Sequence, residues 1–376
     1  VKMYIAYLTG EDSLYREALA LPVWYCNPFR LETIDVLAKA KAACPDSERP
    51  YYYLGNLLYN IQPDNAMAEW RKCVEMNQKD DLAWRNLGWA NWLHTKDYAE
   101  SVRCYRKAIE INPNAALYLE ECDQAMEANR TPVPERYELL KSHHATCEKR
   151  YYPLSQEVVL GTWCGDYDYV LGLLDRCYFP TREGVANFHD NFVDACVLAG
   201  KAKLEKGDAK AAIALYEKAF TYPENHQVFL VDERATHDAQ INYELGVAYE
   251  SLGDKENADK YYELAADQDF KLKGSKDFRY WTGLALGKLG RKAEAKALFR
   301  QMVADGKAAV VTEYRSFYGA EGTTASTTES KNSAAYFTQA LGELGLGHKK
   351  QADRLFKKVL ELKPDHLYAH ELSAAE

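Results

Sequence analysis

The histidines near the end of the chain are the residues whose type and spacing come closest to a metal site. His366 and His370 lie four residues apart, a spacing that places two ligands on one face of a helix. Only Asp365 and Glu371 stand beside them as further ligands. A zinc site needs a full ligand set, and hydrogen bonds that orient those ligands. The sequence therefore predicts no metal site.

The cysteines are scattered and odd in number. Structural zinc sites need closely spaced thiolates, and redox motifs need the C-x-x-C pair, which is absent here. We interpret the cysteines as small buried apolar side chains in a reducing compartment, which predicts a cytoplasmic protein. The nine of them lie at positions 26, 44, 73, 104, 122, 147, 164, 177 and 196.

No arrangement of residues indicates catalysis. Acidic residues are frequent, but no pair stands out as a general acid and base. The glycines at 161–165 and 342–347 lack the spacing of phosphate-binding loops. A G-x-S-x-G turn and a helical Cys–His dyad are also missing. We therefore expect neither an enzyme nor a cofactor.

Composition excludes two further classes of partner. The net charge is 47 − 56 = −9, and binding to nucleic acid or anionic lipid depends on clustered Lys and Arg that this chain lacks. No apolar run approaches the roughly 20 residues that cross a bilayer. We expect no contact with nucleic acid or membrane. Because the chain opens at Val1, already in an amphipathic pattern, we expect it to be excised from a longer protein.

The elements that would position any site come from an internal repeat. Its pattern is aromatic–x2–Leu-Gly–x2–aromatic or Leu, then Gly, then Ala–x3–aromatic–x2–Ala, then Pro. The Leu-Gly pairs at 54–55 and 87–88 lie 33 residues apart (87 − 54 = 33), close to the roughly 34-residue tetratricopeptide period. Small residues let two helices approach, and aromatics fill the spaces between pairs. Clear copies occupy 84–113, 200–223 and 242–265, and weaker copies begin near Tyr51, Gly283 and Tyr336.

Six copies in one frame predict an all-α, tetratricopeptide-like superhelix, a solenoid with irregular helices and a long polar loop near 304–332. Gly-Asp at 207–208 and 253–254 indicates a glycine that ends one helix and an Asp that caps the next. We expect N-terminal helical repeats at 1–128, an irregular connector with a half-repeat at 129–190, central repeats at 191–303, a loop insertion at 304–332 and a C-terminal repeat at 333–376.

Landmarks outside the repeat carry a further resemblance. They are Asp81–Gly88 (DLAWRNLG), Glu135-Arg136, Gly165–Asp168, Phe179, Glu183-Gly184 and Tyr222–Asn225. The chain resembles the C-terminal repeat region of a bacterial family of unknown function, whose N-terminal domain is β-rich and mutarotase-like. The resemblance implies a parent protein that handles carbohydrate. The chain departs from the family pattern around position 183 and after Asn225, so a role of those segments is not implied.

The repeat register also predicts a binding surface. In tetratricopeptide repeats the fifth, ninth and twelfth positions of the first helix usually face the concave side. In two successive copies these positions hold an aromatic-rich set with the composition of a binding hot spot: Tyr52, Asn56, Arg85, Trp89 and Trp92. The alternative is that helices from 129–190 cover this set, which would make Trp89 and Trp92 ordinary core residues.

A more specific mode of binding is not favoured. The chaperone-binding subset of these repeats grips a C-terminal carboxylate with Lys and Asn at the fifth and ninth positions, followed by Asn at the sixth position of the next repeat. Asn56 and Asn86 match, but Tyr52 replaces the Lys.

The leading hypothesis is thus a scaffold that binds a protein or peptide partner. The N-terminal part of its own parent chain is one candidate for that partner. Alternatives are a non-catalytic accessory region of a carbohydrate-active enzyme whose aromatics touch sugar, and self-assembly through an exposed end.

Overall fold

The chain folds into helices throughout the part that the structure describes. The computed structural model describes residues 1–376 apart from 24–25, 181–187, 228–236, 268–275, 315–326 and 374–376. Within the described residues, the one β-type pairing is an isolated parallel bridge between Phe179 and His226, and no extended strand occurs. None of the described helices combines the length and the apolar character needed to cross a bilayer. The prediction of an all-α fold is confirmed.

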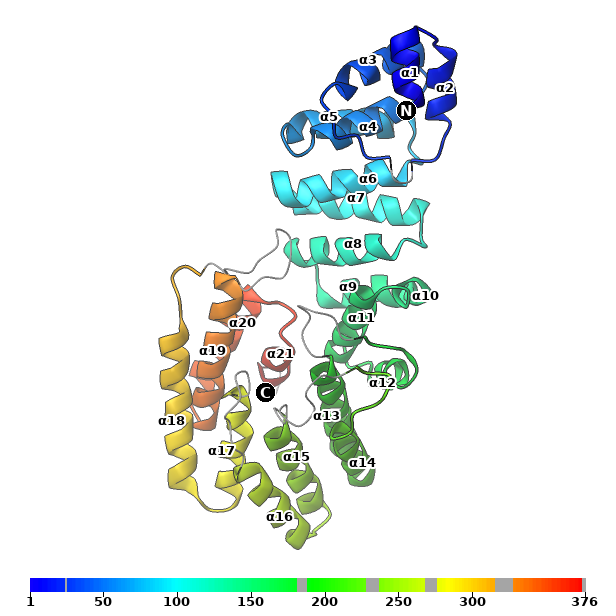
Figure 1. Ribbon diagram of the computed structural model, residues 1–376. Helices are drawn as coiled ribbons and strands as arrows, with labels where there is room; N and C mark the ends of the chain where they lie inside the picture. The colour runs from blue at the N-terminus through cyan, green and yellow to red at the C-terminus, as the bar shows by residue number, and fades with distance from the viewer. Residues whose placement is uncertain (24–25, 181–187, 228–236, 268–275, 315–326, 374–376) are drawn as a thin grey trace. The chain divides into compact units, whose positions relative to one another are not determined.

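The helices divide between two compact units, the first made of residues 1–131 and 142–153 and the second of 132–141 and 154–376. Helices α1 to α8 belong to the first unit (Figure 1). The first unit contains α1 (Lys2–Thr9), α2 (Ser13–Leu19), α3 (Thr33–Ala43), α4 (Arg49–Leu58), α5 (Pro63–Met76), α6 (Asp81–Ala90), the π-helix η1 (Asn91–Thr95), α7 (Tyr98–Ile111), α8 (Ala116–Ala128) and α10 (His144–Cys147).

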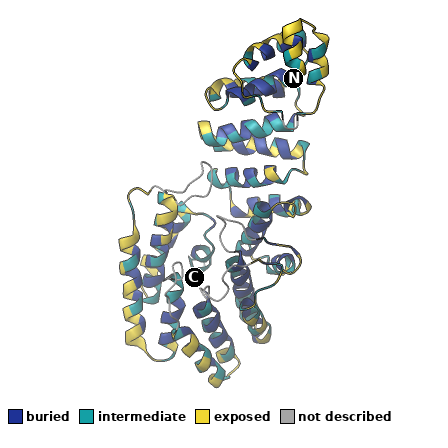
Figure 2. Cartoon of the chain, viewed as in Figure 1, coloured by how far each residue is buried: buried dark blue, intermediate teal, exposed yellow. Residues whose placement is uncertain are grey.

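The second unit is larger, and α11 (Tyr151–Trp163) enters it from the first. Its other elements are α9 (Val133–Ser142), α12 (Tyr167–Arg176), α13 (His189–Glu205), α14 (Ala209–Ala219), α15 (Asp238–Ser251), α16 (Lys255–Ala266), the short 3₁₀ helix η3 (Lys276–Phe278), α17 (Arg279–Lys288), α18 (Lys292–Ala309), α19 (Thr328–Gly345), α20 (Lys349–Leu362) and α21 (Leu367–Ser373). In both units the buried residues lie along the sides of the helices that face a neighbouring helix (Figure 2).

One steric contact recurs in five hairpins and explains the repeat. A glycine on the first helix lies under an aromatic ring on the second, so that a β-carbon would collide with the ring; at Gly88 it would lie 2.9 Å from the ring of Tyr105. Only glycine permits this approach, and the ring then fills the space above it. The pairs are Gly55–Trp70, Gly88–Tyr105, Gly200–Tyr216, Gly246–Tyr262 and Gly283–Phe299.

The turns between paired helices follow the predicted chemistry. Gly207 and Gly253 end their helices in the left-handed region, with φ of 82° and 76°. Asp208 and Asp254 then cap the next helices, accepting hydrogen bonds from the backbone N–H of Ala211 at 3.0 Å and of Asn257 at 3.1 Å. Both roles are those that the Gly-Asp pairs predicted.

The α6–α7 hairpin departs from this pattern. Gly88 and Tyr105 are 17 residues apart (105 − 88 = 17), whereas Gly200 and Tyr216 are 16 apart (216 − 200 = 16). The extra residue is absorbed by the π-helical turn η1, which follows α6 without a break. Lys96 ends that turn in the left-handed region, with φ of 60°. A π-turn is the usual way to insert one residue into a helix, and such turns occur often at functional sites.

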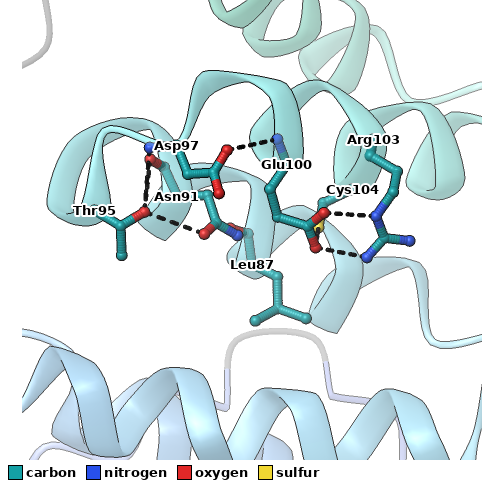
Figure 3. A network of polar contacts seen from close by, with 7 residues as sticks. All are labelled: Leu87, Asn91, Thr95, Asp97, Glu100, Arg103 and Cys104. Atoms are coloured by element: carbon teal, nitrogen blue, oxygen red, sulfur yellow. Dashed lines mark hydrogen bonds and ion pairs between the residues drawn. The ribbon is translucent and has the colours of Figure 1, made fainter.

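Side chains hold the π-turn in place (Figure 3). Asn91 donates to the backbone oxygen of Leu87 at 2.8 Å, and the Thr95 hydroxyl donates to the Asn91 side chain at 3.2 Å. Asp97 caps α7 by accepting from the backbone N–H of Glu100 at 3.0 Å. Since these bonds replace those that a regular helix would make, the backbone groups released by the π-turn remain partnered.

The polar loop expected near 304–332 is shorter than the sequence suggested. α18 continues to Ala309, and α19 begins at Thr328. Thr327 and Ser330 form a capping box at the start of α19, a signal hidden within a polar run. Part of the run, at 323–326, lies outside the described residues. The two helices pack closely, because a β-carbon on Gly306 would lie 2.6 Å from Gln339.

Candidate functional site

The five residues predicted to bind a partner lie on α4, α6 and η1 of the first unit. Tyr52 and Asn56 are on α4, and the other three follow on the first helix of the next hairpin. The two helices are linked by a hydrogen bond from Asn86 Nδ2 to Asn56 Oδ1 at 2.9 Å. The structure thus places the set on two neighbouring first helices and the π-turn that follows the second.

Tyr52 belongs to the core rather than to the surface. Its side chain is buried, its ring meets that of Tyr53 edge to face at 5.5 Å, and burial raises the pKa of its hydroxyl. The indole nitrogen of Trp70 lies 3.3 Å from the Tyr52 backbone oxygen and 3.1 Å from Asn56 Oδ1. Tyr52 therefore offers a partner little contact area. The Asn56 oxygen is occupied, and the Asn56 side chain also hydrogen-bonds the Tyr52 hydroxyl.

Arg85 is neutralised by a residue that the sequence did not single out. Its Nε donates to Glu121 Oε2 at 2.7 Å, and a second bond joins Nη2 to Oε1. Burial lowers the pKa of Arg85, but the Glu121 carboxylate offsets this, so the pKa is raised. The guanidinium carbon lies 5.2 Å from the ring centre of Trp89. Arg85 thus orients Trp89 and carries no free charge for an anion.

Glu121 lies on α8, the next first helix after α6. It follows Leu87 by 34 residues (121 − 87 = 34), which is one repeat period. If the repeat register had been continued beyond Pro113, it would have predicted that Glu121 lies beside α6. It was missed because 116–128 lacks the Leu-Gly pair by which the copies were aligned.

Trp89 and Trp92 form the accessible part of this surface. Their rings meet edge to face, with centres 5.6 Å apart and planes at 89°. Both side chains are half-buried. No hydrogen-bond acceptor for either indole N–H is found among the described residues. Trp92 stands on the π-turn, so the inserted residue sets its direction relative to Trp89.

Other residues considered from the sequence are placed elsewhere. Trp84, at the fourth position of the same copy as Trp89, is half-buried, and its indole N–H donates to the backbone oxygen of Gln78 at 3.0 Å. His366 packs on Phe337 with ring centres 4.3 Å apart, whereas His370 stacks on Trp163 at 3.9 Å. The two histidine rings therefore contact different partners.

Comparison with known proteins supports the interpretation of the repeat. One tetratricopeptide repeat model matches residues 83–115, 193–226 and 239–271, and a second matches 277–305. These segments cover the hairpins α6–α7, α13–α14, α15–α16 and α17–α18. The chain contains tetratricopeptide repeats. Tetratricopeptide repeats generally mediate contacts between proteins. The resemblance to the bacterial family with a β-rich N-terminal domain stays an expectation.

Several solved structures are similar to the chain at low identity. The tetratricopeptide protein YrrB, described as having an unusual peptide-binding site, is 14% identical; the match covers 62% of this chain and 92% of YrrB, with a TM-score of 0.31. PilF of Pseudomonas aeruginosa is 13% identical, with coverage of 58% and 90% and a TM-score of 0.33. A tetratricopeptide repeat protein from Parabacteroides merdae is 14% identical, with coverage of 75% and 96% and a TM-score of 0.31. TM-scores this low carry no argument about the site.

Proposed function

We propose that the chain is a non-catalytic protein-interaction module, and that its first unit binds a peptide segment through the surface formed by α4, α6 and η1. The observation that carries this proposal is the Trp89–Trp92 pair, half-exposed and with both indole N–H groups without an acceptor in the described chain. A partner that covers the rings and supplies backbone carbonyls would satisfy both needs. Tryptophan is among the residues that contribute most to protein interfaces.

The polar neighbours define the chemistry of the partner. Asn56 is committed to hydrogen bonds with Trp70, Asn86 and Tyr52, and Glu121 already neutralises Arg85. The surface therefore suits an extended or helical segment that offers apolar side chains and carbonyl oxygens. It does not suit a free C-terminal carboxylate, because no uncommitted cation stands at the fifth position, where Tyr52 is buried.

The partner is a segment of another protein or of the parent chain. The nine cysteines, all of them in the described chain, form no disulfide bonds, which supports our further proposal that the protein works in a reducing compartment such as the cytoplasm. No observation in the structure favours contact with sugar.

The test is a quantitative pulldown from the source cell with the whole chain as bait. Trp89→Ala combined with Trp92→Ala should lower recovery of the specific partner at least tenfold, since truncating interface tryptophans commonly costs about 2 kcal/mol or more. Trp84→Ala is the matched control, because it removes the same side chain from α6 at a place where that side chain contacts Gln78 and Arg103 of the chain itself. Equal recovery with the double variant and the unmodified chain would reject the proposed surface.

A further inference from the structure

The last helix, α21, lies among the other helices of the second unit (Figure 1). It follows α20 after a short connection through Lys363 and Pro364. Its side chains and those of the connection reach helices that precede it by more than a hundred residues. A helix that merely closed the last hairpin would contact α20 and little else, so these distant contacts need a separate explanation.

Tyr368 is the centre of the contacts. Its hydroxyl donates to Asp194 Oδ1 at 2.6 Å and accepts from Gln240 Nε2 at 2.9 Å. Its ring meets Trp281 edge to face, with centres 5.6 Å apart. Tyr368 is thus held by three residues that come from α13, α15 and α17, the first helices of three successive hairpins: two hold its hydroxyl and the third packs on its ring.

The two residues that hold the hydroxyl occupy the same position of the repeat. Asp194 precedes the repeat glycine Gly200 by six residues (200 − 194 = 6), and Gln240 precedes Gly246 by six (246 − 240 = 6). Equivalent positions on successive first helices form one continuous surface, which is how a repeat array presents a ligand-binding face. Asp194 and Gln240 thus form part of a repeat surface, and Tyr368 is bound to that surface.

Contacts on either side of Tyr368 have the same character. Asp365 forms a buried ion pair with Arg136 of α9 at 3.2 Å. His370 stacks on Trp163 of α11, with ring centres 3.9 Å apart and planes at 18°. Charged hydrogen bonds and aromatic contacts of this kind are typical of interfaces between a peptide and its receptor.

α21 buries little of its own surface, although Tyr368 and Leu372 pack against the core that includes Ala369. Ala369 is its one buried residue. A cavity of about 220 Å³ remains beside it, lined in part by Asp194 and Tyr368. At seven residues, α21 is too short to be a stable helix by itself, since isolated helices shorter than roughly 12 residues are marginal in water. Its conformation therefore depends on the surface beneath it.

We infer that α13, α15 and α17 present a second docking surface, which recognises a short segment with a tyrosine flanked by histidines, and that α21 is the segment that occupies it. The surface is built from Asp194, Gln240 and Trp281. A partner that uses this surface has to displace α21. The inference does not depend on the proposed function, because it concerns other residues in the other unit.

The experiment uses the full chain and a fluorescein-labelled peptide of residues 364–373, PDHLYAHELS, with fluorescence anisotropy as the readout. Tyr368→Ala removes the anchor from the chain itself, so the labelled peptide should bind this variant at least tenfold more tightly than it binds the unmodified chain. A peptide with Tyr368→Phe should bind the variant about tenfold more weakly, because it lacks the hydrogen bond to the Asp194 carboxylate. Tyr7→Ala, at an exposed tyrosine in the first unit, is the control and should behave like the unmodified chain.

Two outcomes would overturn the inference: no binding to a Tyr368→Ala chain that keeps its helical circular dichroism, or equal binding to the variant and the unmodified chain. If the variant does not fold, hydrogen exchange on the unmodified chain decides. The amides of α21 should then exchange at least tenfold faster than those of the middle of α20, because a docked segment opens locally. Equal protection of the two helices would show that α21 is part of the core.

Discussion

At the scale of single residues, the close contact of a glycine with an aromatic ring sets the spacing of the hairpins. Gly283 and Gly287 lie one turn apart on α17. Alanine substitutions at the two positions should change the free energy of unfolding in opposite directions. A β-carbon on Gly283 would overlap the ring of Phe299, whereas nothing lies within 4 Å of the β-carbon position at Gly287.

We expect Gly283→Ala to lower the free energy of unfolding by roughly 1–3 kcal/mol through overpacking. Gly287→Ala should raise it by roughly 0.5–1 kcal/mol, because alanine has the higher helix propensity. Urea denaturation followed by circular dichroism measures both changes. A stabilising Gly283→Ala would show that the ring is not held over the glycine.

The cysteines allow a second test at this scale. Seven of the nine are buried, and Cys26 and Cys164 are half-buried. Burial raises the pKa of Cys104, Cys122 and Cys196 to about 12 in each case, which leaves almost no thiolate near neutral pH.

With a thiol-reactive dye at about pH 8, the thiols of Cys26 and Cys164 should react quickly. The seven buried thiols should react only as fast as the chain unfolds. Mass spectrometry of the labelled peptides identifies them. Rapid labelling of Cys122 would contradict the packing of α8 described above.

At the scale of elements, the α6–α7 turn stores backbone strain that the hairpins closed by a glycine avoid. Lys96 has φ of 60°, in the region where Gly207, Gly253, Gly290 and Gly347 stand in other hairpins. A side chain in this conformation costs roughly 1–2 kcal/mol. The π-turn before it carries Trp92, so the strained turn and the accessible indole belong to the same insertion.

Lys96→Gly should therefore raise the free energy of unfolding by roughly 0.5–1 kcal/mol, the relief of strain being partly offset by a more flexible unfolded chain. Gly207→Ala is the converse and should lower the free energy of unfolding by about 1 kcal/mol, because φ there is 82°. No atom lies within 4 Å of the added β-carbon, so the loss comes from the backbone alone. Thermal melts of both variants provide the comparison. A destabilising Lys96→Gly would mean that the lysine side chain contributes more than the strain costs.

At the scale of the whole molecule, the two units differ in the groups that they bury. In the second unit, several buried ionisable groups lie on the connection to α21 or beside the residues that contact it. Burial raises the pKa of Asp194 to about 7. Burial lowers the pKa of His237 to about 3, and burial with the nearby Lys363 lowers that of His366 to about 4. The stability of the second unit should therefore depend on pH through these groups.

For His366 the direction follows from the two pKa values. Between the ordinary value of 6.5 and about 4, the unfolded chain binds a proton that the folded chain does not, so the stability present above pH 6.5 is lost as the pH falls toward 4. His366→Phe keeps a ring against Phe337 and removes this loss. The difference in stability between about pH 7 and pH 4.5 should then shrink by roughly 1–2 kcal/mol.

Denaturation at the two pH values measures this change. Parallel pH profiles for the His366 variant and the unmodified chain would contradict the burial of that ring.

The sequence alone determined the repeat, because its signals are local. Three of these signals are the contact of Gly88 with Tyr105, the left-handed Gly207 and the cap at Asp208. Each involves residues of one hairpin, where the separation along the chain is enough to predict which residues meet. The repeat register also predicted that the five proposed binding residues would fall on the neighbouring helices α4 and α6 and the π-turn that follows, and that they share a binding surface stays a prediction. The tertiary structure decided what each of them contacts: Tyr52 is buried, and Arg85 is paired with Glu121.

The contacts of α21 could not be predicted in this way. Tyr368 and Asp194 lie 174 residues apart (368 − 194 = 174), and no local pattern links them. How far a repeat array curves depends on the sum of small rotations between hairpins, set by the packing of side chains such as Gly306 against Gln339. Because those rotations arise only when the helices have packed, the sequence specified the hairpins, and the tertiary structure decided which helices meet α21.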